Sequence, residues 1–145
     1  EKSPDYTLFT DGGARGNPGP AGAGALIKRG DMVLKKIAKP LGKRTNNWAE
    51  YEAVIVALEE LIKIVPESRR KETIVEVRLD SELIARQLSG KYQVKEETLF
   101  SQYIKAHNLL VKDFPNTTFV HIPREKNKEA DALSNEAMDA NAKKQ

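Results

Sequence analysis

The stretch that decides the fold is YTLFTDGGARGNPGPAG, residues 6–22. Its first five residues are mostly β-branched, aromatic or apolar, which predicts a strand over 6–10. Asp11 ends this strand, and a segment rich in glycine, proline and alanine follows it as far as Gly24. An aspartate at that place either opens a turn or belongs to a functional site. The rest of the chain decides between the two.

Hydrophobic periodicity outside this stretch predicts an alternation of strands and helices. Further strands are expected over 25–28, 32–37, 73–79 and 117–122. Helices are expected over 48–65, 81–88, 96–112 and 127–142. The segments 40–47 and 67–72 are interpreted as a polar connection and a charged linker. This order predicts an α/β fold with a five-stranded mixed sheet and helices on both faces.

Length and composition restrict the classes of protein that the chain can represent. Its 145 residues suit one domain over 1–145, and 39% hydrophobic with 31% charged residues exclude a disordered chain. The absence of cysteine excludes disulfides, thiolate metal sites and a cysteine nucleophile. His107 and His121 are the only histidines, and we expect structural roles for both. No apolar run approaches the ~20 residues of a membrane span, so we expect no membrane partner and a cytoplasmic location.

Charge is unevenly distributed along the chain, although the formal net charge is only +3. Residues 28–44 contain seven basic side chains and one acid, whereas residues 50–60 contain four acids and no base. Such a basic stripe beside an acidic centre suits an enzyme that binds a polyanion and cuts it with metal ions. The same stripe also suits a solvated edge strand whose lysines prevent aggregation. Charge alone leaves both interpretations open.

Four carboxylates lie at the ends of predicted elements or on a buried face. Asp11 and Asp80 each end a strand, Glu50 lies on the apolar face of the first helix, and Asp131 lies in the first turns of the last helix. Each one alone is explained by a cap or a turn. Together they favour convergence on one site, where cations would neutralise their mutual repulsion. Hard oxygen ligands of this kind suit Mg²⁺ or Mn²⁺.

Four motifs containing these residues occur in an order that resembles the type 1 ribonuclease H family. They are the segment 6–22, TNNWAEYEA at 45–53, LDS at 79–81 and NKEADAL at 127–133. The resemblance covers nearly the whole chain. It implies a ribonuclease H-like fold in which Asp11, Glu50, Asp80 and Asp131 are the catalytic, metal-binding carboxylates.

The resemblance also implies an activity, which is endonucleolytic hydrolysis of the RNA strand of RNA/DNA hybrids to 5′-phosphate and 3′-hydroxyl ends. Two Mg²⁺ ions, replaceable by Mn²⁺, would flank the scissile phosphate. Asp11 would bridge both ions, Asp80 and Asp131 would hold the ion on the nucleophile side, and Glu50 the ion on the leaving-group side. A monomer is expected, either alone or as part of a larger chain.

Substrate-binding residues follow from the same resemblance. The small residues Gly12 and Gly13 would let the backbone approach the RNA strand. Polar and basic side chains would contact bases and DNA-strand phosphates, namely Asn17, Lys43, Arg44, Thr45, Asn46 and Asn47. Tyr92, with Gln87, would face the DNA channel. Capping of the first helix is the alternative for Asn46 and Asn47, and a place at the edge of the core is the alternative for Tyr92.

The sequence departs from the family pattern at two places. Many members carry a mobile histidine in a loop before the last aspartate, but residues 122–127 form a short segment without one. Arg124 would replace that histidine as a cationic catalytic group, as in the archaeal-like branch of the family, or would pair with Glu125 or Glu129 on the surface. The basic protrusion of some relatives is also missing, because residues 90–95 run almost directly into the next helix.

Three other interpretations of the chain compete with this one. The glycines invite comparison with a phosphate-binding loop, but no GxGxxG or GxxxxGK[ST] pattern is present and Pro18 and Pro20 prevent a helix there. A domain cut from a reverse transcriptase or a two-domain fusion would share the same motifs. A catalytically silent hybrid-binding module is the alternative from another class, against which the complete set of four carboxylates argues.

Overall fold

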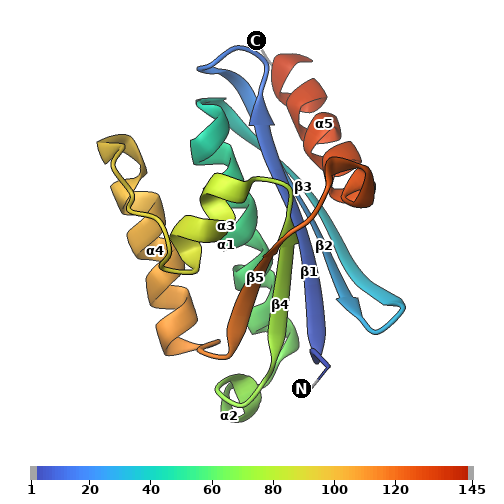
Figure 1. The fold of residues 1–145 in the computed structure, drawn as a ribbon. Helices are drawn as coiled ribbons and strands as arrows, with labels where there is room; N and C mark the ends of the chain where they lie inside the picture. Colours follow the sequence, from blue (N-terminus) through green and yellow to red (C-terminus); the bar gives the residue numbers. More distant parts are fainter. Residues whose placement is uncertain (1–2, 144–145) are drawn as a thin grey trace.

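A computed structural model describes the backbone of residues 3–143 and the side chains of residues 3–141. Its sheet has five strands: β1 (Tyr6–Ala14), β2 (Gly19–Arg29), β3 (Met32–Arg44), β4 (Val75–Leu79) and β5 (Thr117–His121). They lie in the order β3-β2-β1-β4-β5, with β1, β2 and β3 antiparallel and β4 and β5 parallel to β1 (Figure 1). The predicted five-stranded mixed sheet is therefore confirmed.

Helices cover both faces of this sheet (Figure 1). On one face lie α1 (Asn46–Ile64), α3 (Glu82–Leu88) and α4 (Phe100–Lys112), and on the other lies α5 (Lys128–Lys143). The one-turn α2 (Glu67–Arg70) follows α1, and the short 3-10 helices η1 (Glu97–Leu99) and η2 (Arg124–Lys126) precede α4 and α5. None of the helices in the described part of the chain combines the length and the apolar character that a membrane crossing requires.

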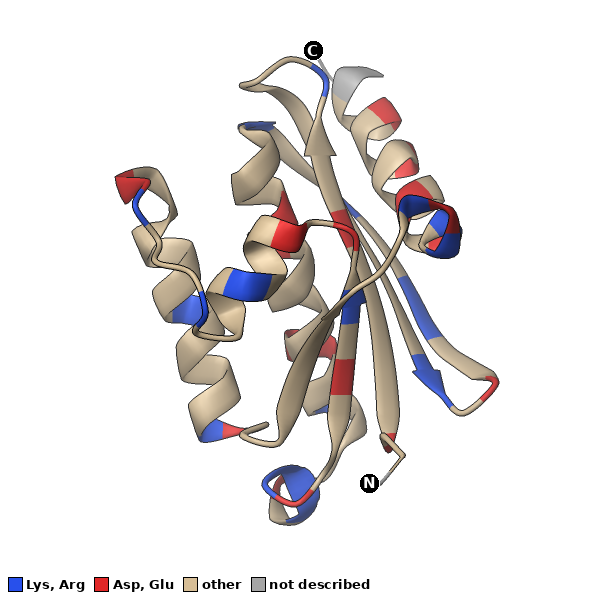
Figure 2. Cartoon of the chain, viewed as in Figure 1, with Lys and Arg blue, Asp and Glu red and all other residues tan. Residues whose placement is uncertain are grey.

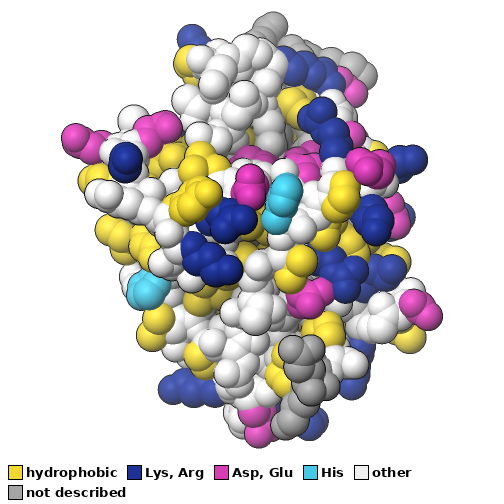
Figure 3. All heavy atoms as spheres, viewed as in Figure 1, with side chains coloured by type: hydrophobic (Ala, Val, Ile, Leu, Met, Phe, Trp, Pro, Cys, Tyr) yellow, Lys and Arg dark blue, Asp and Glu magenta, His cyan; other side chains and the backbone are white. Residues whose placement is uncertain are grey.

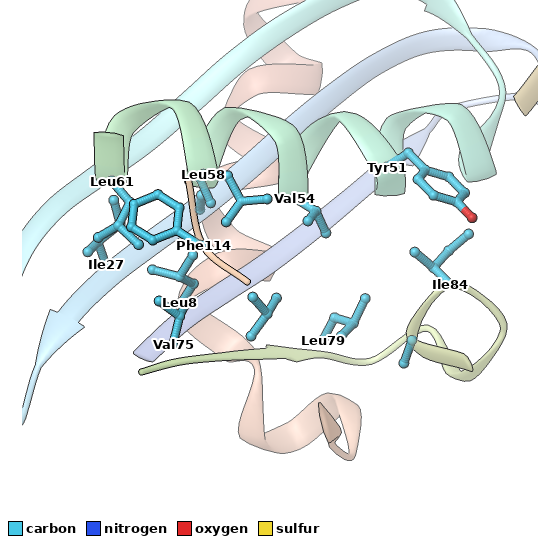
Figure 4. Close-up of a cluster of buried hydrophobic side chains, with 14 of the residues drawn as sticks. Leu8, Ile27, Tyr51, Val54, Leu58, Leu61, Val75, Leu79, Ile84 and Phe114 are labelled. Atoms are coloured by element: carbon cyan, nitrogen blue, oxygen red, sulfur yellow. The ribbon is translucent and has the colours of Figure 1, made fainter. Parts of the chain in front are cut away.

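The main hydrophobic core lies between the sheet and α1. Strand residues such as Leu8, Ile27 and Val75 pack against Val54 and Leu58 of α1, and all five are fully buried (Figure 4). Burial of each such side chain contributes about 1.5–3 kcal/mol of hydrophobic free energy. The apolar stripe of α1 that the sequence predicts is therefore the part of the helix that holds it on the sheet.

The contact between the sheet and α5 is made of small residues instead. A Cβ atom placed on Gly24 would lie 2.4 Å from the carbonyl oxygen of Ala130, and one on Gly22 would lie 2.7 Å from the backbone nitrogen of Met138. Side chains at these two positions would push the helix away from the strand. The glycines of β2 therefore let the α5 backbone rest directly on the sheet.

Four predicted boundaries are wrong. The first strand, expected to end at Asp11, continues to Ala14, because residues 11–14 keep pairing with β2. Residues 19–24, expected to be irregular, form the first half of β2, because their small side chains suit a strand under a close helix. Residues 40–44, expected to be a connection, continue β3, and Pro40 is accommodated because β3 is an edge strand with a register shift nearby. The expected linker 67–72 contains α2.

Candidate active site

Three of the four predicted carboxylates meet at the centre of the sheet. Each of these residues contributes one carboxylate oxygen to a group whose members all lie within 4.8 Å of one another, and the residues are Asp11, Glu50 and Asp80. Asp11 lies in β1, Glu50 in the first half of α1, and Asp80 directly after β4, so three separate elements supply the group. Acidic segments of β1, α1 and the β4–α3 connection accordingly gather in one region of Figure 2.

Close contact between α1 and β1 places Glu50. Thr45 caps α1, since its hydroxyl accepts a hydrogen bond from the backbone N–H of Trp48 at 3.3 Å. A Cβ atom on Gly12 would lie 2.1 Å from the carbonyl oxygen of Ala49, so only glycine permits this approach. The backbone N–H of Gly12 then donates to Oε1 of Glu50 at 2.6 Å and holds the carboxylate in place.

Asp131 reaches the same region from the opposite face of the sheet. Asn127, which directly precedes α5, is 1% exposed and donates from Nδ2 to the carbonyl oxygen of Thr10 at 2.9 Å. This bond fixes the start of α5 beside β1. The side chain of Asp131 lines the same cleft as the other carboxylates but lies outside the group of three.

Burial and mutual repulsion raise the pKa values of two of these carboxyl groups. Burial, followed by the charge of Asp80, raises the pKa of Asp11 from its ordinary value of 3.8 to about 7. Burial, followed by the charge of Asp11, raises the pKa of Glu50 well above its usual range. The hydrogen bonds from Ser134 to Asp11 and from Gly12 to Glu50 act in the opposite direction. The site therefore holds negative charge at a cost that a bound cation would remove.

The carboxylates lie in a cleft of about 420 Å³. Its rim includes Asn46 and Asn47 of α1 and Arg124 of η2. Arg124 is exposed and forms no ion pair among the described residues, and its alternative partner Glu129 pairs instead with Lys36 at 3.7 Å. In the space-filling view, acidic side chains lie recessed between basic groups on this side of the molecule (Figure 3).

These residues fit a hard divalent cation. All the candidate donors are carboxylate oxygens, which Mg²⁺ and Mn²⁺ prefer. Oδ2 of Asp80 is buried and has no hydrogen-bond partner, which is costly for an anionic oxygen unless a ligand satisfies it. Asp11, Glu50 and Asp80 would therefore hold such an ion, with Asp131 beside them.

The predicted amide residues are partly engaged within the protein. Oδ1 of Asn46 accepts from the backbone N–H of Ala14 at 2.8 Å, and Oδ1 of Asn17 accepts from the backbone N–H of Asn46 at 3.0 Å. These bonds tie the turn after β1 to the start of α1. Capping, the alternative for Asn46 and Asn47, belongs to Thr45 instead. Gly13 lines the cleft, whereas the N–H of Gly12 is used by Glu50.

The predicted phosphate-binding residues lie at the end of β3. Lys43 and Arg44 are exposed, and the guanidinium carbon of Arg44 lies 3.9 Å from the ring centroid of Trp48. The basic stripe 28–44 comprises the last two residues of β2, the turn after them and the whole of β3, so most of it lies on an edge strand. Both interpretations of the stripe are compatible with that position.

Tyr92 lies outside the carboxylate cleft. It is 47% exposed, and the guanidinium of Arg86 lies 5.4 Å from its ring centroid, so a place at the edge of the core is wrong. Gln87 was expected to face the DNA channel, but it is buried and accepts from the hydroxyl of Tyr51 at 2.6 Å. Its position on the inner side of α3 explains the error.

Sequence reasoning missed two features of the cleft. The hydroxyl of Ser134 donates to Oδ2 of Asp11 at 2.9 Å. Arg15, in the turn after β1, binds Asp139 and donates to Oδ1 of Asn135 at 3.3 Å, which ties this turn to α5. The position of Ser134 three residues after Asp131 was the available signal, because that spacing places both on one side of a helix.

The chain is similar to known proteins in both sequence and structure. A protein-family model described as reverse transcriptase-like matches residues 9–137. LC11-RNase H1, isolated from compost by a metagenomic approach, is 48% identical with a TM-score of 0.88, and the alignment covers 95% of this chain and 98% of that one. The same relative has also been solved in complex with an RNA/DNA hybrid.

Two further relatives support the assignment. The N-terminal RNase H domain of Rv2228c from Mycobacterium tuberculosis has a TM-score of 0.87 and 35% identity over 98% of this chain and 99% of that domain. Ribonuclease HI from Halobacterium salinarum is 37% identical over 90% of this chain and 63% of its own length. The chain spans only 36% of the full bifunctional protein Rv2228c. With its sheet, its carboxylates and these likenesses in agreement, the chain belongs to the type 1 ribonuclease H family.

Proposed function

We propose that this chain hydrolyses the RNA strand of RNA/DNA hybrids, using divalent metal ions held by Asp11, Glu50, Asp80 and Asp131. The observation that carries the proposal is the approach of three carboxylate oxygens to within 4.8 Å of one another in a chain of this family. LC11-RNase H1, which shares the fold, binds such a hybrid. Two Mg²⁺ ions, with Mn²⁺ as a substitute, are the proposed cofactors.

Each side chain of the site has a task in this scheme. Divalent ions at such a site neutralise a phosphate and activate water. The Gly12 N–H fixes the carboxylate of Glu50, and the Ser134 hydroxyl donates to that of Asp11. Asp80 offers an oxygen that the protein itself does not satisfy. These preset orientations reduce the reorganisation required when the scissile phosphate arrives.

Substrate recognition falls to the rim of the cleft. Asn46 and Asn47 border it, and amides offer both donors and acceptors to base edges and 2′-hydroxyls in the minor groove. Asn17, in the turn after β1, and the backbone at Gly12 and Gly13, near the end of β1, would contact the RNA strand. Lys43, Arg44 and Thr45 lie together where β3 meets α1 and would bind a phosphate of the DNA strand, while Tyr92 would face that strand farther along.

The assembly and location of the protein are part of the proposal. We infer that residues 1–145 are one catalytic domain that acts as a monomer, alone or within a longer chain, in the cytoplasm. Analytical ultracentrifugation of the protein, with and without hybrid, would test whether it is a monomer. A stable dimer would contribute twice the mass of one chain.

A single assay tests the activity itself. End-labelled RNA/DNA, RNA/RNA and DNA/DNA duplexes of one sequence are incubated with the chain, with and without Mg²⁺. We expect metal-dependent cleavage of the RNA strand in the hybrid, leaving 5′-phosphate and 3′-hydroxyl ends, and far slower cleavage of both pure duplexes. Binding of the hybrid without cleavage would identify a silent binding module, and equal rates on RNA/RNA would point to another kind of nuclease.

Arg124 is proposed to replace the missing loop histidine through its charge. An arginine guanidinium stays protonated, so it would hold the scissile phosphate or favour product release rather than donate a proton. We expect Arg124→Ala to lower kcat by about 10–100-fold with little change in hybrid affinity, since positioned charges contribute a few kcal/mol at phosphoryl centres. Arg124→Lys should restore part of the loss.

The control for Arg124 is Arg69→Ala, which removes an exposed arginine of α2 that pairs with Glu72 at 4.0 Å, far from the cleft. Steady-state kinetics at saturating Mg²⁺ compare the three variants. A wild-type kcat for Arg124→Ala would make Arg124 an ordinary surface residue.

A further inference from the structure

The buried hydroxyl of Ser134 lies against the carboxylate of Asp11. Ser134 is 1% exposed and donates from Oγ to Oδ2 of Asp11 at 2.9 Å across 123 residues of sequence. This distance is that of an ordinary hydroxyl hydrogen bond, longer than the about 2.5–2.7 Å of the short charge-assisted kind. Among the described residues, it is the side-chain hydroxyl that fixes this carboxylate.

The same hydroxyl has a local alternative. The carbonyl oxygen of Asp131 lies 3.0 Å from Oγ of Ser134, at the i−3 position that serine hydroxyls commonly bind within a helix. The hydroxyl carries one proton, so it can donate fully to only one of these acceptors. An ionised Asp11 is the stronger acceptor of the two. When the Ser134 hydroxyl donates to it, the hydrogen bond links α5, which carries Asp131, to β1, which carries Asp11.

The close packing of α5 against β2 holds the backbone of Ser134 in place. A Cβ atom on Gly24 would lie 2.5 Å from the backbone nitrogen of Ser134, and one on Gly22 would lie 2.7 Å from its carbonyl oxygen. The serine backbone therefore lies directly against β2 at both its nitrogen and its carbonyl oxygen. It cannot move away from Asp11 without movement of α5, so only rotation of the serine side chain can break the hydrogen bond.

We propose that Ser134 is a positioning residue that sets the affinity of the site for divalent metal by fixing the orientation of the Asp11 carboxylate. A bond to Oδ2 stops rotation about the Cβ–Cγ bond of Asp11 and so fixes the direction of its other oxygen. Glu50 has an equivalent restraint in the Gly12 N–H. Groups that orient metal ligands commonly contribute 10–100-fold in metal affinity or activity. This inference rests on the proposed metal-dependent activity.

The test compares Ser134→Ala and Ser134→Cys with the wild-type chain. Cysteine nearly preserves the volume of serine but is a weak donor, so it keeps the packing while removing the strong hydrogen bond. Mn²⁺ binding to the free protein is measured by calorimetry or by electron paramagnetic resonance. The Mg²⁺ concentration for half-maximal cleavage and the KM for hybrid are measured in parallel. We expect both variants to require about tenfold more metal, with kcat at saturating metal and KM for hybrid within about threefold of wild type.

Asn141→Ala is the matched control. Asn141 is also a buried polar residue of α5, but its amide binds both backbone groups of Gly42, at 3.2 and 2.8 Å, away from the carboxylates. We expect this variant to lower the melting temperature without changing metal affinity. If Ser134→Ala and Ser134→Cys behave in the same way, Ser134 serves only to hold α5 and the proposal is wrong. A wild-type chain that neither binds metal nor cleaves hybrid would instead overturn the proposed function.

Discussion

The two faces of the central sheet are built on opposite principles. On the α1 face, large apolar side chains such as Leu58, Val77 and Ile27 fill the space between helix and strands. On the α5 face, Gly22 and Gly24 bring the helix backbone into direct contact with β2. The α1 face is stabilised by the apolar area that it buries. On the α5 face, the backbones of helix and strand lie close together, but fewer apolar side chains are in contact.

The candidate site lies where both arrangements meet. Glu50 arrives from the α1 face, Asp131 and Ser134 arrive from the α5 face, and Asp11 lies between them in β1. The difference teaches that large apolar contacts supply stability, whereas close contacts at glycines, Gly12 with α1 and Gly22 and Gly24 with α5, place the site residues. Changes among the apolar contacts of α1 should therefore only destabilise the protein, while changes at the glycine contacts should also disturb the site.

The largest effect is expected at the carboxylate that both faces share. Asp11→Asn should lower cleavage by about a thousandfold or more, because the amide lacks the charge that binds cations and several kcal/mol of stabilisation are lost. The metal-free variant should melt at the wild-type temperature or above it at pH 8, since the repulsion from Asp80 is relieved. Turnover and thermal melting of the same preparation check both points. Substantial activity in folded Asp11→Asn would remove Asp11 from the site.

On the α1 face, we expect a large loss of stability without a catalytic defect. Leu58→Ala leaves a cavity beneath a fully buried side chain and should cost about 2–5 kcal/mol of unfolding free energy. Urea denaturation measures this loss. At a temperature where the variant remains folded, kcat and metal affinity should equal those of the wild type. A changed metal affinity would show that the two faces are not separable.

On the α5 face, Gly24→Ala should cost less stability but more function. The added methyl group meets backbone atoms of Ala130 and Ser134 and should cost about 1–3 kcal/mol by overpacking. The shift of α5 should also weaken metal binding, because Asp131 and Ser134 move with it. Gly13→Ala is the control for stability, since the atoms nearest to its methyl group would belong to the Met138 and Asn46 side chains at 3.6–3.9 Å. If the two variants have equal stability and equal metal affinity, the close packing of α5 on Gly24 does not determine either property, and the account of this face is wrong.

The sequence predicted the α1 face better than the α5 face. Apolar residues at helical spacing predict a buried stripe, and residues 48–65 showed one. Residues 19–24 gave no strand signal, because glycine and proline disfavour strands in general and only the later position of α5 explains them here. The motifs predicted which carboxylates matter. The hydrogen bond from Ser134 to Asp11 depends on a contact across 123 residues, which no local pattern contains.

The smallest effect concerns pH. The pKa of Asp11 is raised from 3.8 to about 7 in the folded state, so the folded protein binds this proton more tightly than the unfolded chain does. The corresponding stability is complete below about pH 4 and is lost as the pH rises through about 7. Glu50 acts with the same sign. Without metal, the melting temperature should therefore fall by a few degrees over this range, and less in Asp11→Asn. A melting temperature that rises over the same range in EDTA would contradict the raised pKa of Asp11.

The central claim is that β1, α1 and the end of β4 bring their carboxylates together to bind divalent metal. Anomalous scattering from crystals soaked in Mn²⁺ tests this claim most directly, with Asp11→Asn crystals as the control. We predict a Mn²⁺ peak about 2.2 Å from carboxylate oxygens of Asp11, Glu50 or Asp80, and no such peak in the variant. A peak that persists in Asp11→Asn, or wild-type crystals with Mn²⁺ bound only elsewhere, would contradict the account.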